Sequence, residues 1–416
     1  MVFKTDTPDV GEAILSGAVK QFLMLERPRR EELFHYYEGV RGVDKGRVAA
    51  GRPDNRLSAN YAKYITDVHT GYFMGVPPTL EFAGKRLQER MVRALAEADL
   101  NGTLYSAARD MSICGEGYAL AYLTPKGVRL ARLDPRETFV ITCGIREEVV
   151  AAVRVNPMAH GAAAGELYTP GLLRKWEFDG RRATLGTAQK LPLSALPVSR
   201  FRNNLSCMGD FEPVCSLLDA YNLLLSGSMD DMQSVANAFL ALYGMQGTTK
   251  EDIDRANSTR VLSLAENGKA EFVVKNMNPQ ALQLLRDTLL DDMLQITMTP
   301  NLNDEAFGTG SSGVALEYKL WGAEQCRSAK ERGFAPGLYH LIALFYQGMS
   351  LLGTPVEGEC SARFYKNLPQ DLTKLCGNLN SLGDLLSRKT RLELLPFITD
   401  AERELQRQRR EQEESK

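Results

Sequence analysis

Two long stretches with helical spacing of apolar residues, separated by a short insert, constrain the fold of this chain more than any other feature. Between Val214 and Leu240 the apolar residues recur every three or four positions, which is the spacing of one face of a helix. Such a helix would extend roughly 40 Å, at about 1.5 Å per residue. A second run begins at Asn278 as N-cap, with Pro279 at the first helical position, and ends at Pro300. The sequence therefore predicts two long helices that can pack antiparallel as a stalk.

The insert between these helices has the pattern of a β-hairpin. Residues 259–275 contain strand-like runs on either side of Asn267-Gly268, a pair that favours a type I′ turn. Two packed helices bury only one face against each other, so the rest of their apolar surface needs other neighbours. We therefore expect a homo-oligomer. The second helix places its apolar residues on one face, namely Leu282, Leu285, Leu289, Met293 and Ile296.

The segments on either side of the stalk combine helices and strands. Before the stalk, a helical stretch breaks at Asn101-Gly102, and a later hairpin turns at Asp179-Gly180. After the stalk come a long helical run, a strand, and a C-terminal helix with Ser387 as a plausible N-cap. These elements predict an α+β fold with an antiparallel sheet. The strand-like runs occupy residues 117–123, 127–133, 138–143, 147–155 and 360–369, and the long helical run occupies 312–352.

Gly308, Gly310 and Gly313 have the G-x-G-x-x-G spacing of a dinucleotide-binding loop, but their surroundings do not fit one. That loop requires a buried strand leading into the first glycine and a βαβ unit around it. Here the preceding residues are polar and include Asp304 and Glu305, which would repel a pyrophosphate at short range. The stretch also lacks the lysine of a P-loop.

We interpret this stretch instead as a polar loop, with Ser311 or Ser312 capping the helix that follows. Loops of this length are usually functional or disordered. An enzyme that uses the glycines and the acid pair to bind a nucleotide or a metal ion is the alternative from the enzyme class.

Composition and charge narrow the remaining function classes. With 416 residues the chain exceeds what one hydrophobic core usually supports, so two or more domains are expected. The net charge of −2 is not that of a polycation that neutralises many phosphates. Seven cysteines form no C-x-x-C pair, and four histidines have no metal-ligand spacing. We therefore expect no catalytic, cofactor or metal site.

The N-terminus and the apolar runs do not predict a membrane protein. The first residues carry acids where a signal peptide needs a basic region followed by an apolar one. No apolar run approaches the roughly 18 residues of a membrane helix. We expect a protein made in the cytoplasm and used there, or used inside a particle assembled there.

Four separated blocks resemble the portal proteins of tailed double-stranded-DNA bacteriophages, most closely the siphophage type. The resemblance implies a ring, typically of twelve subunits, at one vertex of the capsid, in the virion. It implies that a terminase pumps DNA through the channel, and that head-tail adaptors, the major capsid protein and scaffolding proteins are partners. It implies no cofactor and no enzymatic activity of this chain. The blocks are residues 55–82, 211–244, 307–334 and 362–408.

The same resemblance divides the chain into the parts of a portal subunit. An α/β wing leads into a two-helix stem with a small clip between the helices. A tunnel loop, a long helix and a helical crown follow. The implied boundaries are 1–212 for the wing, 213–243 for stem helix 1, 244–276 for the clip, 277–298 for stem helix 2, 299–313 for the tunnel loop, 314–353 for the long wing and crown helix, and 354–416 for the returning wing strand and crown.

The resemblance also implies which residues would meet DNA or partner proteins. A mildly acidic lining would let DNA slide, because a lining that bound phosphates would grip it; intersubunit ion pairs are the other interpretation of the acids. A head adaptor or scaffold without a DNA channel is the alternative outside the enzyme class. In the channel we expect Asp287, Asp291 and Asp292 of the stem, and Asn301, Asn303, Asp304, Glu305, Phe307, Gly308, Thr309, Gly310, Ser311 and Ser312 of the tunnel loop. In the clip we expect Thr259, Arg260, Glu266, Asn267, Lys269 and Glu271.

Overall fold

The computed structural model divides the chain into two compact units, Met1–Lys366 and Asn367–Lys416. Among the described residues, no helix is long and apolar enough to cross a membrane. The structure describes residues 3–46, 53–236, 239–243, 249–251, 254, 269–273, 278–302, 318–353, 356, 358–367, 377, 381, 385–395, 398 and 401–414.

A six-stranded sheet forms one half of the body of the first unit. Strand β1 pairs with β5 in parallel, and the other neighbours are antiparallel and joined by short connections. Helix α1 (Glu12–Gln21) and the π-helical turn Phe22–Glu26 pack on this sheet, where Phe22 contacts Phe139 at a ring-centroid distance of 4.8 Å. The sheet order is β1 (Phe3–Thr5), β5 (Thr138–Cys143), β6 (Glu148–Pro157), β7 (Ala163–Thr169), β8 (Leu172–Phe178) and β9 (Ala183–Lys190).

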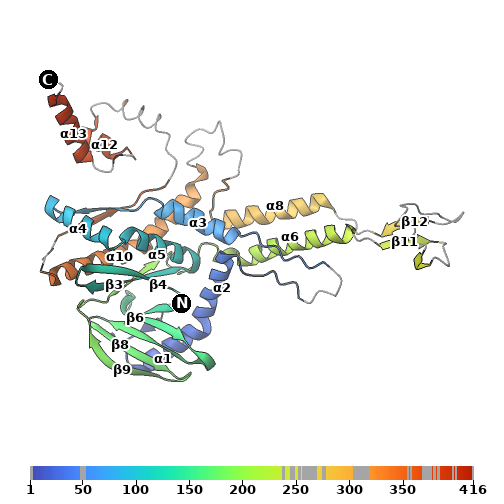
Figure 1. The fold of residues 1–416 in the computed structure, drawn as a ribbon, viewed down its shortest axis with the longest axis horizontal. Coiled ribbons are helices and arrows are strands. Elements are labelled where there is room, and N and C mark those ends of the chain that lie inside the picture. The colour runs from blue at the N-terminus through green and yellow to red at the C-terminus, as the bar shows by residue number, and fades with distance from the viewer. Residues whose placement is uncertain are drawn as a thin grey trace. The chain divides into compact units, whose positions relative to one another are not determined.

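A three-stranded sheet forms the other half and is covered by helices. Its order is β10 (Val198–Arg202), β3 (Glu116–Thr124) and β4 (Gly127–Leu133). Helices α5 (Leu100–Cys114) and α10 (Trp321–Leu351) pack against it (Figure 1). A side chain at Gly333 or Gly337 would overlap the carbonyl oxygens of Arg202 and Arg200, so these glycines let α10 approach β10 closely.

Most of the strands expected in the body are confirmed. Strands β3, β4, β5 and β6 match the four predicted runs, and β8 and β9 form the predicted hairpin. The predicted helical break lies slightly earlier, between α4 (Lys85–Glu97) and α5, because Asp99 caps α5 by accepting a hydrogen bond from the Gly102 N–H. The returning strand β13 (Cys360–Arg363) pairs with β2 (Thr79–Phe82). The remaining body helices are α2 (Arg27–Glu38), α3 (Tyr61–Met74) and the 3₁₀ turns Ala159–Gly161 and Glu212–Val214.

The second unit contains two described helices, α12 (Arg388–Glu393) and α13 (Ala401–Glu414). The predicted N-cap is confirmed, because the Ser387 side chain accepts a hydrogen bond from the Thr390 N–H at 3.1 Å. Helix α13 carries mostly charged residues and glutamine, as its sequence predicts.

The two predicted stalk helices are present as α6 (Cys215–Ala236) and α8 (Pro279–Ile296), which lie side by side (Figure 1). Helix α8 begins as predicted, with the Asn278 side chain accepting a hydrogen bond from the Ala281 N–H and Pro279 at the first position. We call α6 and α8 the stem helices.

The prediction that the first stem helix continues to Leu240 or beyond is wrong. Helix α6 ends at Ala236, and Phe239–Tyr243 forms strand β11. This strand pairs antiparallel with β12 (Lys269–Val273), with Phe239 opposite Val273. Aromatic and branched residues suit a strand as well as a helical face, so the backbone pairing with β12 decides the structure. The predicted strand at 269–273 is confirmed, whereas the Asn267-Gly268 turn and the run from Thr259 lie outside the described residues.

Candidate functional site

Both stem helices join the body through one apolar cluster. Leu218 and Tyr221 of α6 and Met293 of α8 pack with Ile65 of α3, and Met293 is fully buried. The rings of Tyr61 and Tyr221 meet edge to face, with centroids 5.3 Å apart. The two stem helices and α3 therefore form a single packed unit at the base of the stem.

Helix α3 also fixes the point at which the chain leaves α8. The His69 Nε2 atom lies 3.0 Å from the Thr297 carbonyl oxygen and 3.0 Å from the Thr299 hydroxyl. Burial lowers the pKa of His69, so the neutral ring can donate to that carbonyl through Nε2. The Tyr64 hydroxyl donates to the Pro300 carbonyl at 3.1 Å and accepts from the Leu302 N–H at 3.2 Å. The start of the predicted tunnel loop is thereby held on the body.

A buried ionic cluster supports the entry to α6. The Lys330 ammonium of α10 is 2% exposed and donates to Asp210 at 2.7 Å, to the Asn203 side chain and to the Ser112 hydroxyl. Burial alone would raise the pKa of Asp210, but the charge of Lys330, together with the hydrogen bonds that Lys330 and Asn203 donate, lowers it. One ammonium thus ties α10, α5 and the segment before α6 together.

The three predicted channel acids lie on α8 as expected, but not all in the same environment. Asp287 and Asp291 are four residues apart, so they share a face, and this face is opposite to that of Leu289 and Met293. Asp291 and Asp292 are exposed and have no ion-pair partner within the described part of the chain. Asp287 is half-buried and accepts from the neighbouring Arg286 side chain at 2.8 and 2.9 Å.

Helix α6 carries a row of polar side chains that we did not predict from the sequence. Its side chains hydrogen-bond to two segments, residues 40–46 and 53–60, which together we call the strap. Their spacing of three or four residues places them on one face of α6. That spacing is visible in the sequence, but polar residues at helical spacing usually indicate only a solvated face. The residues of this stripe are Asp219, Asn222, Ser226, Asp230 and Gln233.

Comparison with known protein families decides the class of this protein. Residues 21–416 match the family described as phage portal protein, SPP1 Gp6-like. This chain belongs to that portal family.

Two relatives and one solved structure are similar to this portal-family chain. The portal protein of Bacillus phage SPP1 is 22% identical over 424 residues, which cover 95% of this chain and 83% of the relative. The portal protein of Clostridium phage phiCD119 is 21% identical over 429 residues, which cover 92% and 93%. A solved structure described as the neck of a native GTA particle computed with C12 symmetry covers 80% of this chain and 89% of its own, with 12% identity and a TM-score of 0.44. That structural likeness is too loose to establish the fold.

Several residues expected from the portal resemblance lie outside the described part of the chain. These are Asn303 to Ser312 of the tunnel loop, and Thr259, Arg260, Glu266 and Asn267 of the clip. Asn301 is half-buried at the end of the segment held by α3, and Lys269 and Glu271 lie in β12. Their contacts with DNA or partner proteins stay predictions. Among the described residues, no group of three or more histidine, cysteine, aspartate or glutamate side chains could hold a metal ion.

The expectation that five apolar residues of α8 pack on one face holds only in part. Met293 is buried and Leu282 and Leu289 are half-buried, but Leu285 is 49% exposed and Ile296 is 53% exposed. The contacts at the base of the stem explain the difference, because the cluster with α3 and α6 includes α8 at Leu289, Leu290 and Met293 and does not extend to these two positions.

Replacing Lys330 by alanine should destabilise the body by about 3–5 kcal/mol, because Asp210 would remain buried without its partner. Urea unfolding of the purified protein measures this change. The matched control is Arg332→Ala, an exposed cation on the same helix, which should change the free energy of unfolding by less than about 0.5 kcal/mol. Equal stability of the two variants would show that the Lys330 cluster is not a structural support.

Proposed function

We propose that this chain is the subunit of a portal ring at a capsid vertex, through whose central channel DNA enters and leaves the head. The match of residues 21–416 to the portal family carries this proposal. The paired stem helices and the strand pair β11–β12 between them support it, because they follow in the order that the family resemblance predicts.

Assembly into a ring would use the apolar surface that one chain leaves uncovered. Each subunit of a ring meets its two neighbours through two different faces. The stem has exposed apolar side chains on both helices: Leu223, Met229 and Met232 on α6, and Leu284 and Leu285 on α8. We propose that α6 of one subunit packs against α8 of the next, which would cover these side chains in the ring.

The acidic residues of α8 suit the lining of a channel that DNA slides through. Asp291 and Asp292 are exposed and lie away from the apolar cluster that joins α8 to the body. Carboxylates at the channel wall would repel phosphates and keep the duplex from binding to one position. The tunnel loop between Thr299 and Gly313 would stand at the narrowest part of this channel.

The partners follow from the same proposal. A terminase and the head-tail adaptors would dock on the clip that contains β11 and β12, and the major capsid and scaffolding proteins would contact the wing. The chain itself would be structural, with the terminase as the source of energy, and would assemble in the host cytoplasm before it becomes part of the virion. An enzyme that uses the glycine loop would instead bind a nucleotide or Mg²⁺ saturably, which equilibrium binding to the purified protein tests.

Deleting Gly308 to Ser312 should leave rings intact and impair DNA packaging or retention. The segment lies between two parts of the chain that are anchored independently, α8 on α3 and α10 on β10, so its loss should not disturb ring assembly. Electron microscopy of the rings and the yield of filled heads measure the two effects. Rings that dissociate would contradict the tunnel-loop assignment, and filled heads at the wild-type yield would contradict its role in packaging.

A further inference from the structure

The strap and α6 are joined by hydrogen bonds that recur at a regular spacing in both segments. The Ala59 N–H donates to the Asn222 side chain at 2.8 Å, the Leu57 N–H donates to the Ser226 hydroxyl at 2.9 Å, and the Asn55 N–H donates to Asp230 at 2.8 Å. Each step of two residues along the strap therefore corresponds to a step of four residues back along α6.

This correspondence has a geometric basis. Two residues of extended chain advance by about 6.6 Å, and their alternate N–H groups point to the same side. Four residues of α-helix advance by about 6.0 Å and return to nearly the same face. An extended segment that runs antiparallel to a helix can thus donate one backbone hydrogen bond for every helical turn. Residues 55–59 and the polar stripe of α6 use this match.

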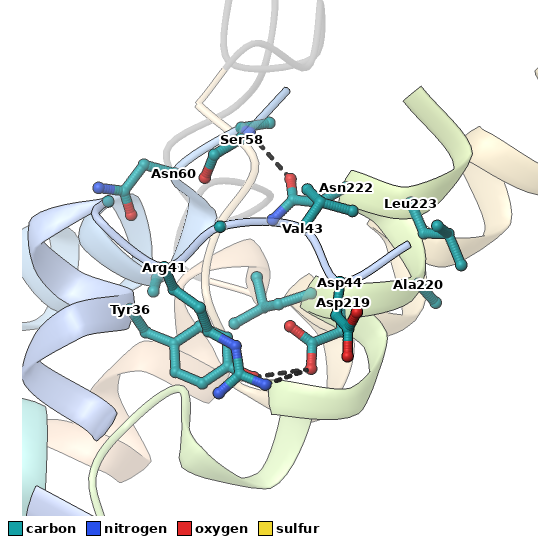
Figure 2. Close-up of a pocket in the computed structure, with 15 residues that line it drawn as sticks. Tyr36, Arg41, Val43, Asp44, Ser58, Asn60, Asp219, Ala220, Asn222 and Leu223 are labelled. Carbon is teal, nitrogen blue, oxygen red and sulfur yellow. Dashed lines mark hydrogen bonds and ion pairs between the residues drawn. The ribbon is translucent and has the colours of Figure 1, made fainter. Parts of the chain in front are cut away.

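Side chains extend the contact toward both ends of α6. Arg41 donates to Asp219 at 3.1 Å, and Tyr36 donates to the same carboxylate at 2.9 Å, as Figure 2 shows. Near the other end of α6, the Lys45 ammonium lies 2.5 Å from Asp230, and the Asn55 side chain donates to Gln233 at 2.9 Å.

The strap is held by these polar contacts and by two apolar side chains, since Val43 is buried and Ala59 packs against the apolar cluster at the base of the stem. A cavity of about 290 Å³ remains between the turn at 39–44 and α6, and Figure 2 shows Val43, Asn222 and Leu223 around it. Asn222, Ser226 and Asp230 are not members of the apolar cluster, so their hydrogen bonds and ion pairs can be removed without deleting an apolar side chain at the base.

We propose that the strap sets the tilt of the stem on the body, with Asn222, Ser226 and Asp230 as the positioning residues. The apolar cluster holds the stem at its base, and a helix held at one end can still pivot. The contacts at Asp230 hold α6 a second time, nine residues or roughly 14 Å beyond Tyr221 of that cluster. Two supports at this separation fix the angle of α6, and α6 in turn carries α8 and its acidic residues. This proposal rests on the portal function proposed above.

The test is a release variant, Asn222→Ala/Ser226→Ala/Asp230→Ala, in the full-length chain. Each lost hydrogen bond should lower the ratio of attached to detached straps about two- to tenfold, so the loss of the three backbone hydrogen bonds alone should lower it roughly 10- to 1000-fold. The loss of the Lys45 ion pair and of the Asn55 side-chain hydrogen bond at Asp230 should lower it further. Alanine favours a helix more than the residues it replaces, so α6 itself should not be weakened. We expect rings that form normally, with a broader distribution of stem angles by cryo-electron microscopy and a loss of packaged DNA.

Two variants separate positioning from a general structural effect. Asn222→Asp/Ser226→Thr keeps both hydrogen-bond acceptors and should keep the wild-type stem angle and packaging. Ser228→Ala removes a hydroxyl of α6 whose hydrogen bond, among the described residues, goes to the Leu224 carbonyl of its own helix, and should also behave as wild type. Wild-type stem angles in the release variant would overturn the proposal, and so would failure of that variant to form rings.

The same images distinguish this proposal from the portal function. If wild-type rings fail to package DNA, the portal function is wrong, while the stem angle of the release variant still tests the strap. If wild-type rings package DNA and the release variant does so equally well with a broadened stem angle, the tilt does not serve packaging and the functional part of the proposal fails.

Discussion

Replacing Glu116 by alanine should destabilise the body by about 3–5 kcal/mol and prevent ring assembly at physiological temperature. Glu116 is buried and is the shared partner of two buried arginines. Arg30 donates to one of its carboxylate oxygens at 2.5 Å, and Arg200 donates to the other at 2.6 Å. The Tyr118 hydroxyl donates to it at 2.9 Å. Removing this carboxylate would take away the ion-pair partner of Arg200 and would leave Arg30 with the more distant Glu26 carboxylate, 3.7 Å away.

The site of this cluster explains why its loss should affect the whole body. Arg30 belongs to α2 and also donates to the carbonyl oxygens of Pro135 and Thr138, next to the start of β5 in the six-stranded sheet. Glu116 and Arg200 belong to β3 and β10 of the three-stranded sheet. The cluster therefore connects both sheets with α2, and its charges fix their relative position.

Urea unfolding measures this effect, with Glu148→Ala as the matched control. Glu148 is an exposed carboxylate at the start of β6, so its removal should change the free energy of unfolding by less than about 0.5 kcal/mol. A Glu116→Ala variant as stable as this control would contradict the prediction, because it would show that Arg30 and Arg200 do not need the Glu116 carboxylate.

The same cluster predicts a dependence of stability on pH. Burial alone would raise the pKa of Glu116, but Arg200 and Arg30 outweigh burial and lower it from 4.5 to about 2. The contribution of Glu116 to stability is therefore fully present above pH 4.5 and is lost as the pH falls toward 2. The free energy of unfolding of Glu116→Gln should accordingly depend less on pH than that of the wild type between these values.

Replacing Met293 by aspartate should separate the stem helices from the body and abolish rings. Met293 is fully buried among α6, α8 and α3, so the variant would lose its apolar contacts and bury a charge with no partner. We expect a cost of at least about 4 kcal/mol, the sum of the lost burial and the desolvated carboxylate. Negative-stain electron microscopy and analytical ultracentrifugation measure the loss of rings.

Two control variants show whether the loss of rings in Met293→Asp results from the burial of the introduced charge. Met293→Leu conserves volume and should cost less than about 1.5 kcal/mol while rings still form. Gln283→Asp adds the same charge at an exposed position of α8 and should leave rings intact. Rings of Met293→Asp at the wild-type yield would contradict the role of this cluster as the base of the stem.

Local signals in the sequence predicted those elements whose structure depends on nearby residues. Asn278 and Pro279 begin α8 because a cap and a fixed φ act within one turn. The end of α6 could not be predicted in this way. Phe239 and Leu240 continue the helical spacing, and only their pairing with residues more than thirty positions away, in β12, makes them a strand.

The contacts between the strap and α6 could not be predicted from the sequence, for the same reason. Residues 40–60 have no helical or alternating pattern, and the backbone hydrogen bonds of the strap go to α6, which follows much later in the chain. Arg30 and Glu116 have the side chains of surface residues, and only the folded chain shows that they are buried together. The acids of α8 could be predicted as a group, because their place on the helix follows from spacing alone.

Cryo-electron microscopy of the purified full-length protein tests the portal account most directly. The account predicts closed rings, typically of twelve subunits, with a central channel wide enough for a DNA duplex, stem helices packed side by side around that channel, and Asp291 and Asp292 facing it. A protein that stays monomeric at all concentrations, or rings whose centre is too narrow for a duplex, would contradict it.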